Sequence, residues 1–223
     1  MVGIVCALRR ELGPLLKRDP EGCRILAAGM GAEAARRGAQ SLIDSAADSA
    51  PLTALISAGY AGGLVKPALP GTIVVHTGSA ELDSALPRAI RGKVVSTDTF
   101  IRTSAERAGL AARTGAVAVD WEAAAVARVA AERGLPFAAV KAITDGPDAE
   151  LVLDWGRYRR PDGSLRTAAA VLAALRTPRG MAELGQLWYA SKEASRVLSA
   201  FLADFLGHWN KRPGALRGVN TES

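Results

Sequence analysis

The chain opens with three short apolar segments that each end in small residues. Residues 2–8, 24–28 and 52–57 are rich in Val, Ile and Leu, and glycine-containing turns follow the second and third segments at Gly29-Met30-Gly31 and at 58–63. A short β-branched run that stops at glycine before a helical or loop segment is typical of α/β proteins. This pattern constrains the fold more than any other feature, and it predicts an α/β architecture.

The remaining sequence continues this alternation of strand and helix patterns. We expect further strands at 72–76, 93–96, 116–119 and 136–143, and helices at 11–17, 32–47, 103–113, 120–133, 165–175 and 182–206, with Thr103 as the cap of the third helix. These elements predict a three-layer α/β/α fold with a twisted mixed central sheet flanked by helices. We expect one domain over 1–207 and a flexible tail over 208–223. The last helix carries an apolar stripe from Leu184 to Phe205 that must be covered.

Length and composition exclude several other classes of protein. A chain of 223 residues buries roughly 70% of the surface that its unfolded state exposes, so it does not need disulfide bonds to fold. Its two cysteines lie in apolar runs, and we therefore expect free buried thiols. Apolar stretches are interrupted well before the ~18 residues that a spanning helix needs. Because Arg9 and Arg10 follow the first apolar run, the order is the reverse of a signal peptide. We expect a cytoplasmic protein without stable membrane insertion.

The net charge of +6 raises the question of a nucleic-acid partner. The basic residues are spread along the whole chain, with one modest cluster at 157–160, and stacking aromatics are not interleaved with them. The charge therefore indicates an arginine-rich surface, and we expect no nucleic-acid partner. His76 and His208 are far apart in the sequence, so we expect no metal site.

Polar side chains gather where the predicted strands end, which is where open α/β sheets bind ligands. The acidic residues at these positions are Glu11, Asp98, Asp120, Glu122 and Asp145. Such a set predicts acid and base chemistry on a small polar molecule. The turn at Gly29-Met30-Gly31 also resembles the glycine-rich motif that binds dinucleotides. That motif requires an acidic residue at the end of the next strand to bind the ribose, and none stands there. A tight strand-to-helix turn is the favoured interpretation.

Five segments in sequence order carry a resemblance to a known family. They are Gly3 to Glu11, Gly29 to Ala35, Ser57 to Leu64, Ser96 to Ile101, and the pair Val119 to Ala123 with Ala142 to Asp145. Together they resemble the nucleoside phosphorylase and nucleosidase superfamily, especially the methylthioadenosine/S-adenosylhomocysteine nucleosidase type. The resemblance covers residues 3 to 147 and implies a phosphorylase/hydrolase-like fold. It also implies cleavage of the N-glycosidic bond of a purine nucleoside, with adenine as the expected base.

The resemblance assigns roles to nine residues. Asp145 would be the general acid on the purine, and Glu122 would hold the ribose hydroxyls. Phe100 would stack on the base, and main-chain groups of Ile101 would meet its edge. Tyr60, Ala61, Gly62 and Trp121 fall in the substrate-binding motifs, and Glu11 would be the catalytic base.

The residues at the nucleophile position favour water over phosphate. Phosphate-using members carry an arginine near the end of the first motif and an arginine and a serine around the third glycine loop, and the corresponding places here are Glu11, Ser57 and Tyr60. A carboxylate repels a phosphate dianion but accepts a proton from water. Arg9 and Arg10 keep phosphorolysis open as the alternative. We therefore expect no metal or organic cofactor, with inorganic phosphate as the alternative co-substrate.

Three departures from the family concern the substrate. Tyr60 and Trp121 replace a small residue and a methionine, and a non-catalytic nucleoside-binding protein is the alternative in which they block the nucleophile. The connection from Val75 to Val94 is short, which resembles the hopanoid-associated phosphorylase subgroup, thought to act on a 5′-lipid-linked adenosine. Such a substrate would bring surface contact with a membrane. By resemblance we expect a homodimer or a higher homo-oligomer.

Overall fold

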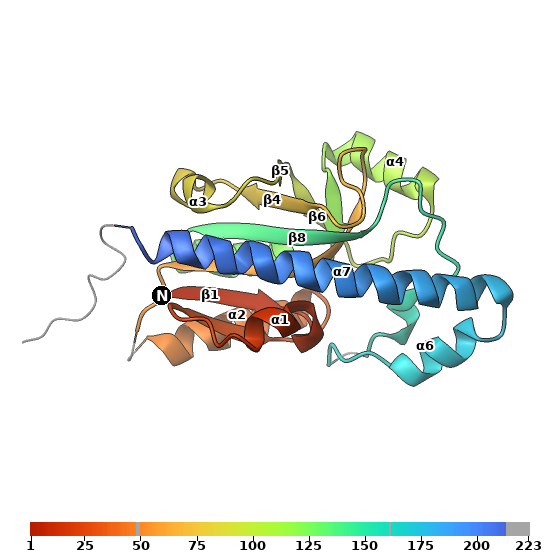
Figure 1. Cartoon of the computed structure of the whole chain (residues 1–223), viewed down its shortest axis with the longest axis horizontal. Coiled ribbons are helices and arrows are strands. Elements are labelled where there is room, and N and C mark those ends of the chain that lie inside the picture. The colour runs from red at the N-terminus through yellow and green to blue at the C-terminus, as the bar shows by residue number, and fades with distance from the viewer. Residues whose placement is uncertain (48–49, 161, 213–223) are drawn as a thin grey trace, which may run out of the picture.

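The computed structural model describes residues 1–47, 50–160 and 162–212, and within them eight strands form one mixed sheet (Figure 1). The strands are β1 (Val2–Cys6), β2 (Cys23–Ala27), β3 (Ala54–Gly63), β4 (Ile73–Thr77), β5 (Ile90–Arg91), β6 (Val94–Ser96), β7 (Ala118–Asp120) and β8 (Phe137–Asp145). Their order is β2-β1-β3-β8-β4-β5, and β6 and β7 extend from the far half of β3. Strands β2, β1, β3 and β8 are parallel, whereas β4 runs antiparallel to β8 and β7 antiparallel to β3. The mixed sheet predicted from the sequence is confirmed.

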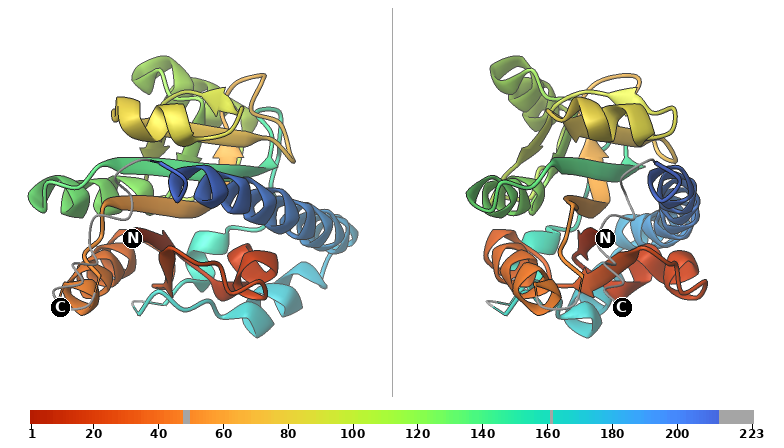
Figure 2. Two further views of the ribbon diagram at one scale, coloured as in Figure 1. Left: turned by 60° about the vertical axis from the view of Figure 1, so that its left-hand side comes forward. Right: turned by 90° about the vertical axis from the view of Figure 1, so that its left-hand side faces the viewer.

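Helices cover both faces of this sheet (Figure 2). They are α1 (Gly13–Leu16), α2 (Ala32–Ala46), α3 (Ala80–Ala85), α4 (Ser104–Thr114), α5 (Ala123–Glu132), α6 (Thr167–Ala174) and α7 (Pro178–Trp209), with short 3-10 turns at Arg9–Leu12 and Trp155–Tyr158. One face packs against α7 together with α1 and α3, and the other against α2 and α5. The arrangement is the expected three-layer α/β/α fold.

Strand β3 shows how the sequence divides between the two layers. Side chains along a strand alternate between faces, and here Ala54 and Ile56 join the cluster under α7 while Leu55 joins the cluster under α2 and α5. All three are fully buried. An apolar run without alternation is therefore what a strand buried on both faces requires.

The observed elements differ from the predicted ones at several boundaries. Strand β3 continues through the glycine-rich segment to Gly63 and does not end at Ser57, because its second half pairs with β8 and β7. The helix predicted from residue 120 begins at Ala123. A short helix, α3, was not predicted, and it lies between β4 and β5.

The last helix is longer at both ends than its apolar stripe predicts. Helix α7 spans 32 residues, from Pro178 to Trp209, and Trp209 is buried in the sheet-facing cluster. The second half of the stripe, from Leu198 onward, is buried, whereas Trp188 in the first half is 64% exposed. Residues 213–223 of the predicted tail lie outside the described residues. In the described part of the chain, no helix is long and apolar enough to cross a membrane.

Candidate active site

A cavity of about 690 Å³ lies where β1, β3, β7 and β8 end, and the first half of α7 closes one side of it. All nine residues that the sequence analysis proposed line this cavity, namely Glu11, Tyr60, Ala61, Gly62, Phe100, Ile101, Trp121, Glu122 and Asp145. Residues 77–93, the short connection, do not contribute to its lining. The motifs thus converge on one site although they are scattered over more than half of the chain.

Asp145 stands at the carboxyl end of β8 and is held from two sides. Nη2 of Arg107, which projects from α4, lies 2.6 Å from Oδ2 of Asp145, and the Thr144 hydroxyl donates a 2.7 Å hydrogen bond to Oδ1. Arg107 is fully buried, and Asp145 retains 16% exposure of its side chain. A Cβ at Gly62 would lie within 3 Å of both partners, so only glycine at this position of β3 lets the pair pack here.

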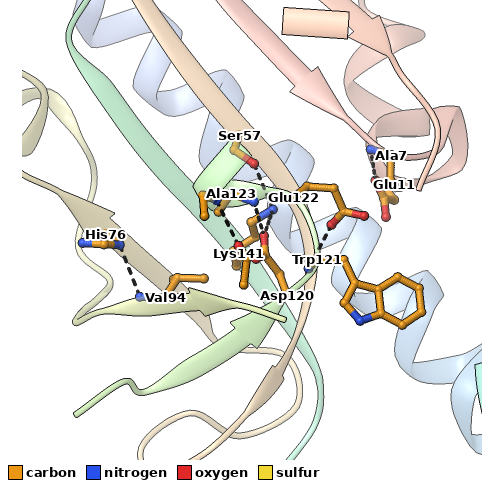
Figure 3. A network of polar contacts seen from close by, with 12 residues as sticks. Ala7, Glu11, Ser57, His76, Val94, Asp120, Trp121, Glu122, Ala123 and Lys141 are labelled. Carbon is orange, nitrogen blue, oxygen red and sulfur yellow. Dashed lines mark hydrogen bonds and ion pairs between the residues drawn. The ribbon is translucent and has the colours of Figure 1, made fainter. Parts of the chain in front are cut away.

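Glu122 follows β7 and has no charged partner in direct contact (Figure 3). Its Oε1 accepts a 2.7 Å hydrogen bond from the amide of Gly31, and Oε2 accepts one from the amide of Trp121. Burial and the nearby carboxylate of Asp120 raise the pKa of Glu122 to about 7. The glycine turn at 29–31, where Gly29 and Gly31 adopt positive φ angles, thus serves as a tight turn whose amide orients this carboxyl group.

Behind Glu122 lies a buried ion pair between Lys141 and Asp120 (Figure 3). Lys141 Nζ is 2.7 Å from Asp120 Oδ2 and donates a hydrogen bond to the hydroxyl of Ser57. Burial opposes the charge of Lys141, but the carboxylates of Asp120 and Glu122 outweigh it and raise its pKa above the usual value. The hydroxyl of Ser96 donates a further hydrogen bond to Oδ1 of Asp120.

Glu11 lies in the 3-10 turn after β1 and lines the large cavity together with Glu122. The amides of Ala7 and Leu8 donate hydrogen bonds of 3.0 and 3.1 Å to its Oε2. Burial raises the pKa of Glu11, although these amides and the charge of Lys141 act in the opposite direction. A buried carboxyl group with a raised pKa is suited to accept a proton near neutral pH.

A second, much smaller cavity of about 10 Å³ adjoins Glu11. Its lining includes Ser57, Lys141, Glu11 and Glu122, and the last two also line the large cavity. A volume of this size accommodates about one water molecule, and these polar groups supply the two to four partners that a buried water requires.

Aromatic side chains form another part of the wall of the large cavity. Phe100 and Trp121 meet edge to face with ring centroids 5.8 Å apart, and the guanidinium of Arg159 lies 5.0 Å from the centroid of Trp121. Tyr60 points to α7, where its hydroxyl donates a 2.8 Å hydrogen bond to the carbonyl of Ser191. Leu151, Trp155 and Leu165 also line the cavity, and residues of α7 line it on the side of Tyr60.

Two of the charged residues considered from the sequence do not reach the cavity. Asp98 and Arg9 are exposed and absent from its lining, whereas Arg10 contributes to its rim. Conversely, the sequence analysis missed Arg107, which forms an ion pair with Asp145, and Lys141, which forms one with Asp120. Within the described residues, no group of three or more His, Cys, Asp or Glu side chains is arranged to hold a metal ion.

Comparison with known proteins agrees with this fold. Residues 77–176 match the model of the family described as the Phosphorylase superfamily. Over 74 residues the chain is 38% identical to a 5′-methylthioadenosine/S-adenosylhomocysteine nucleosidase of Treponema pallidum (strain Nichols), a match that covers 33% of this chain and 28% of the relative's length.

Solved structures share the fold over nearly the whole chain. The native futalosine hydrolase of Helicobacter pylori strain 26695 has a TM-score of 0.68 at 16% identity, covering 92% of this chain and 97% of that chain. A methylthioadenosine/S-adenosylhomocysteine nucleosidase of Colwellia psychrerythraea 34H, in complex with adenine, has a TM-score of 0.67 at 18% identity, covering 93% and 94% of the two chains.

Residues 77–176 thus match the superfamily that the motifs resemble, and the solved structures share the predicted fold. Within it, the more particular similarity is to nucleosidases that include the methylthioadenosine/S-adenosylhomocysteine type. Because the structural neighbours have low sequence identity and the curated match is short, they establish the fold and not the reaction.

Proposed function

We propose that the protein hydrolyses the N-glycosidic bond of a purine nucleoside. In this proposal Asp145 is the general acid on the purine, Glu122 holds the ribose hydroxyls, and Glu11 is the base that activates water. Phe100 stacks on the base and the main chain of Ile101 meets its edge. Relatives named as nucleosidases support an N-glycosidic reaction.

The observation that carries the choice of water is the small cavity beside Glu11. Its volume of about 10 Å³ suits one water molecule and is far too small for a phosphate ion. Two of its walls are the buried carboxyl groups of Glu11 and Glu122, which disfavour a dianion. Lys141 and Ser57 border the same space and supply hydrogen-bonding partners for a water molecule.

The proposed reaction balances without any further reactant. The C1′–N9 bond breaks and its electron pair moves into the purine, while the proton of Asp145 passes to N7. Water adds to C1′ and loses a proton to Glu11, and exchange with solvent returns a proton to Asp145. Positive charge that develops on the ribose is stabilised by the ionised Glu122 beside it. The products are the free base and the free sugar.

The nucleophile is tested by product analysis. The purified protein is incubated with adenosine, inosine, methylthioadenosine and an adenosine with a bulky 5′ group, with and without phosphate, and base and sugar products are separated by chromatography. We expect free base and free sugar at a rate that phosphate does not change. Formation of ribose 1-phosphate would overturn the hydrolytic proposal and favour a phosphorylase.

The acid is tested by Asp145→Asn, which cannot donate the carboxyl proton. We expect base release to fall by at least about 100-fold, in the range of general acid catalysis, while circular dichroism shows that the fold persists. Turnover near that of the wild type would remove Asp145 from the mechanism. Nucleoside binding without base release from any substrate would instead support the alternative of a binding protein.

One observation favours a bulky apolar 5′ group on the substrate. Leu184, Leu187 and Trp188 of α7 line the large cavity, and Trp188 is mostly exposed at its edge. This apolar wall supports, as the second candidate, phosphorolysis of a 5′-lipid-linked adenosine, and the substrate panel above separates the two. Cytoplasmic location and homo-oligomerisation stay predictions.

A further inference from the structure

The proposed reaction assigns no role to Arg107, although this residue makes the closest charged contact with the general acid. Its Nη2 lies 2.6 Å from Asp145 Oδ2 and also donates a 3.2 Å hydrogen bond to the carbonyl of Ile101. Nη1 donates to the carbonyl of Gly63 at 3.2 Å. The guanidinium of Arg107 therefore contacts Asp145, the main chain of Ile101 and the end of β3 at Gly63.

A structural role alone does not account for this arginine. Arg107 is 1% exposed, and its Nε has no hydrogen-bond partner among the residues that the structure describes. Burying a cation with an unsatisfied donor costs free energy that an apolar side chain of similar size avoids. The remainder of the cluster beneath α4 is apolar, with Leu110 and Val119 among its members, so an apolar residue would suit the surroundings.

Resting on the proposed function, we propose that Arg107 is a positioning residue that orients Asp145 and promotes transfer of its proton to the purine. Transfer of this proton leaves a carboxylate on Asp145. The guanidinium beside Oδ2 stabilises that charge, so the step that protonates the departing base becomes more favourable. Arg107 does not touch the base and neither gains nor loses a proton.

The test compares Arg107→Met and Arg107→Lys with the wild type. Arg113→Met is the matched control, because Arg113 is exposed on the same helix, α4, and does not line the cavity. Base release from adenosine and methylthioadenosine is measured with every variant. For Arg107→Met we expect kcat to fall about 10- to 100-fold and KM to change little.

Arg107→Lys keeps the positive charge but not the two-pronged contact with Asp145 and Ile101. We expect its kcat with the nucleosides to fall as well. As a second readout, all variants are assayed with 4-nitrophenyl β-D-riboside, whose leaving group departs without protonation. Arg107→Met and Arg107→Lys should cleave this compound at nearly the wild-type rate.

Equal losses on the nucleosides and on the nitrophenyl riboside in Arg107→Met would show that Arg107 only supports the fold and would overturn the inference. Wild-type turnover in Arg107→Met would overturn it as well. Failure of the proposed function looks different, because the wild-type protein itself would then release no base from any nucleoside.

Discussion

Glu122→Gln is expected to make the protein more stable and less active at the same time. The Glu122 carboxyl group is buried, and its pKa of about 7 stands well above the usual 4.5 because burial and the carboxylate of Asp120 oppose its charge. Ionisation of this group in the folded protein therefore costs free energy that ionisation in the unfolded chain does not. Glutamine has nearly the same shape, and its oxygen can still accept the hydrogen bond that the Gly31 amide donates to Oε1.

The magnitude follows from the two pKa values. A rise from 4.5 to about 7 corresponds to about 3 kcal/mol, at roughly 1.36 kcal/mol per pKa unit. Below pH 4.5 the carboxyl group is protonated in both states, so the cost is absent. It grows as the pH rises through the unfolded-state value and is complete above the folded-state pKa of about 7. This group alone thus lowers the stability of the wild type as the pH rises.

Urea denaturation at pH 5, 6, 7 and 8 measures this effect. We expect Glu122→Gln to exceed the wild type by up to about 3 kcal/mol at pH 8 and by about 1 kcal/mol or less at pH 5, while base release falls sharply. Glu132→Gln, the same substitution at the exposed last residue of α5, should change stability little at any pH. A gap that does not narrow at low pH, or a less stable Glu122→Gln at pH 8, would refute the reasoning.

Two further predictions concern stability. Lys141→Met should lower the free energy of unfolding, measured by urea denaturation, by about 3–5 kcal/mol, because it leaves the buried carboxylate of Asp120 unpaired. Adding Asp120→Asn should recover part of this loss. A double variant that is no more stable than Lys141→Met would contradict the ion-pair account. Gly31→Ala should lower the melting temperature, because Gly31 has a φ of +95° and its added Cβ would collide with Arg159. Gly185 lies within α7 with open space around it, so Gly185→Ala should raise the free energy of unfolding by about 0.5–1 kcal/mol. Equal shifts in the two glycine variants would show that this backbone argument is wrong.

The order of elements could be predicted from the sequence because each strand is a short apolar run that ends at a turn signal. The boundaries that were wrong lie where pairing partners decide the structure. Residues 58–63 contain three glycines and were expected to leave the sheet, yet β8 on one side and β7 on the other keep them in strand conformation. Local sequence preference does not contain that information.

The proposed site residues could be gathered from motifs, but two charged neighbours could not. Arg107 lies in a helix whose sequence reads like any solvated one, and its burial depends on packing against β3 and β8. Lys141 did leave a signal, because a lone lysine inside the apolar run of β8 must meet a buried carboxylate. Which carboxylate it meets depends on the pairing of β8 with β3 and of β3 with β7.

The charge of the site connects stability to the choice of nucleophile. Glu11 and Asp120 are buried near Lys141, and Glu122 borders the same small cavity, so the space between these groups carries a net negative charge when all four are ionised. Burial raises the pKa values of Glu11 and Glu122, the carboxylate of Asp120 raises that of Glu122 further, and ionisation of the two groups lowers the stability of the folded state. The negative charge also stabilises a ribose that becomes cationic as the base departs, and it repels a phosphate dianion. Neutralising Glu122 should therefore move stability, turnover and tolerance of phosphate together, because all three depend on the same buried charge.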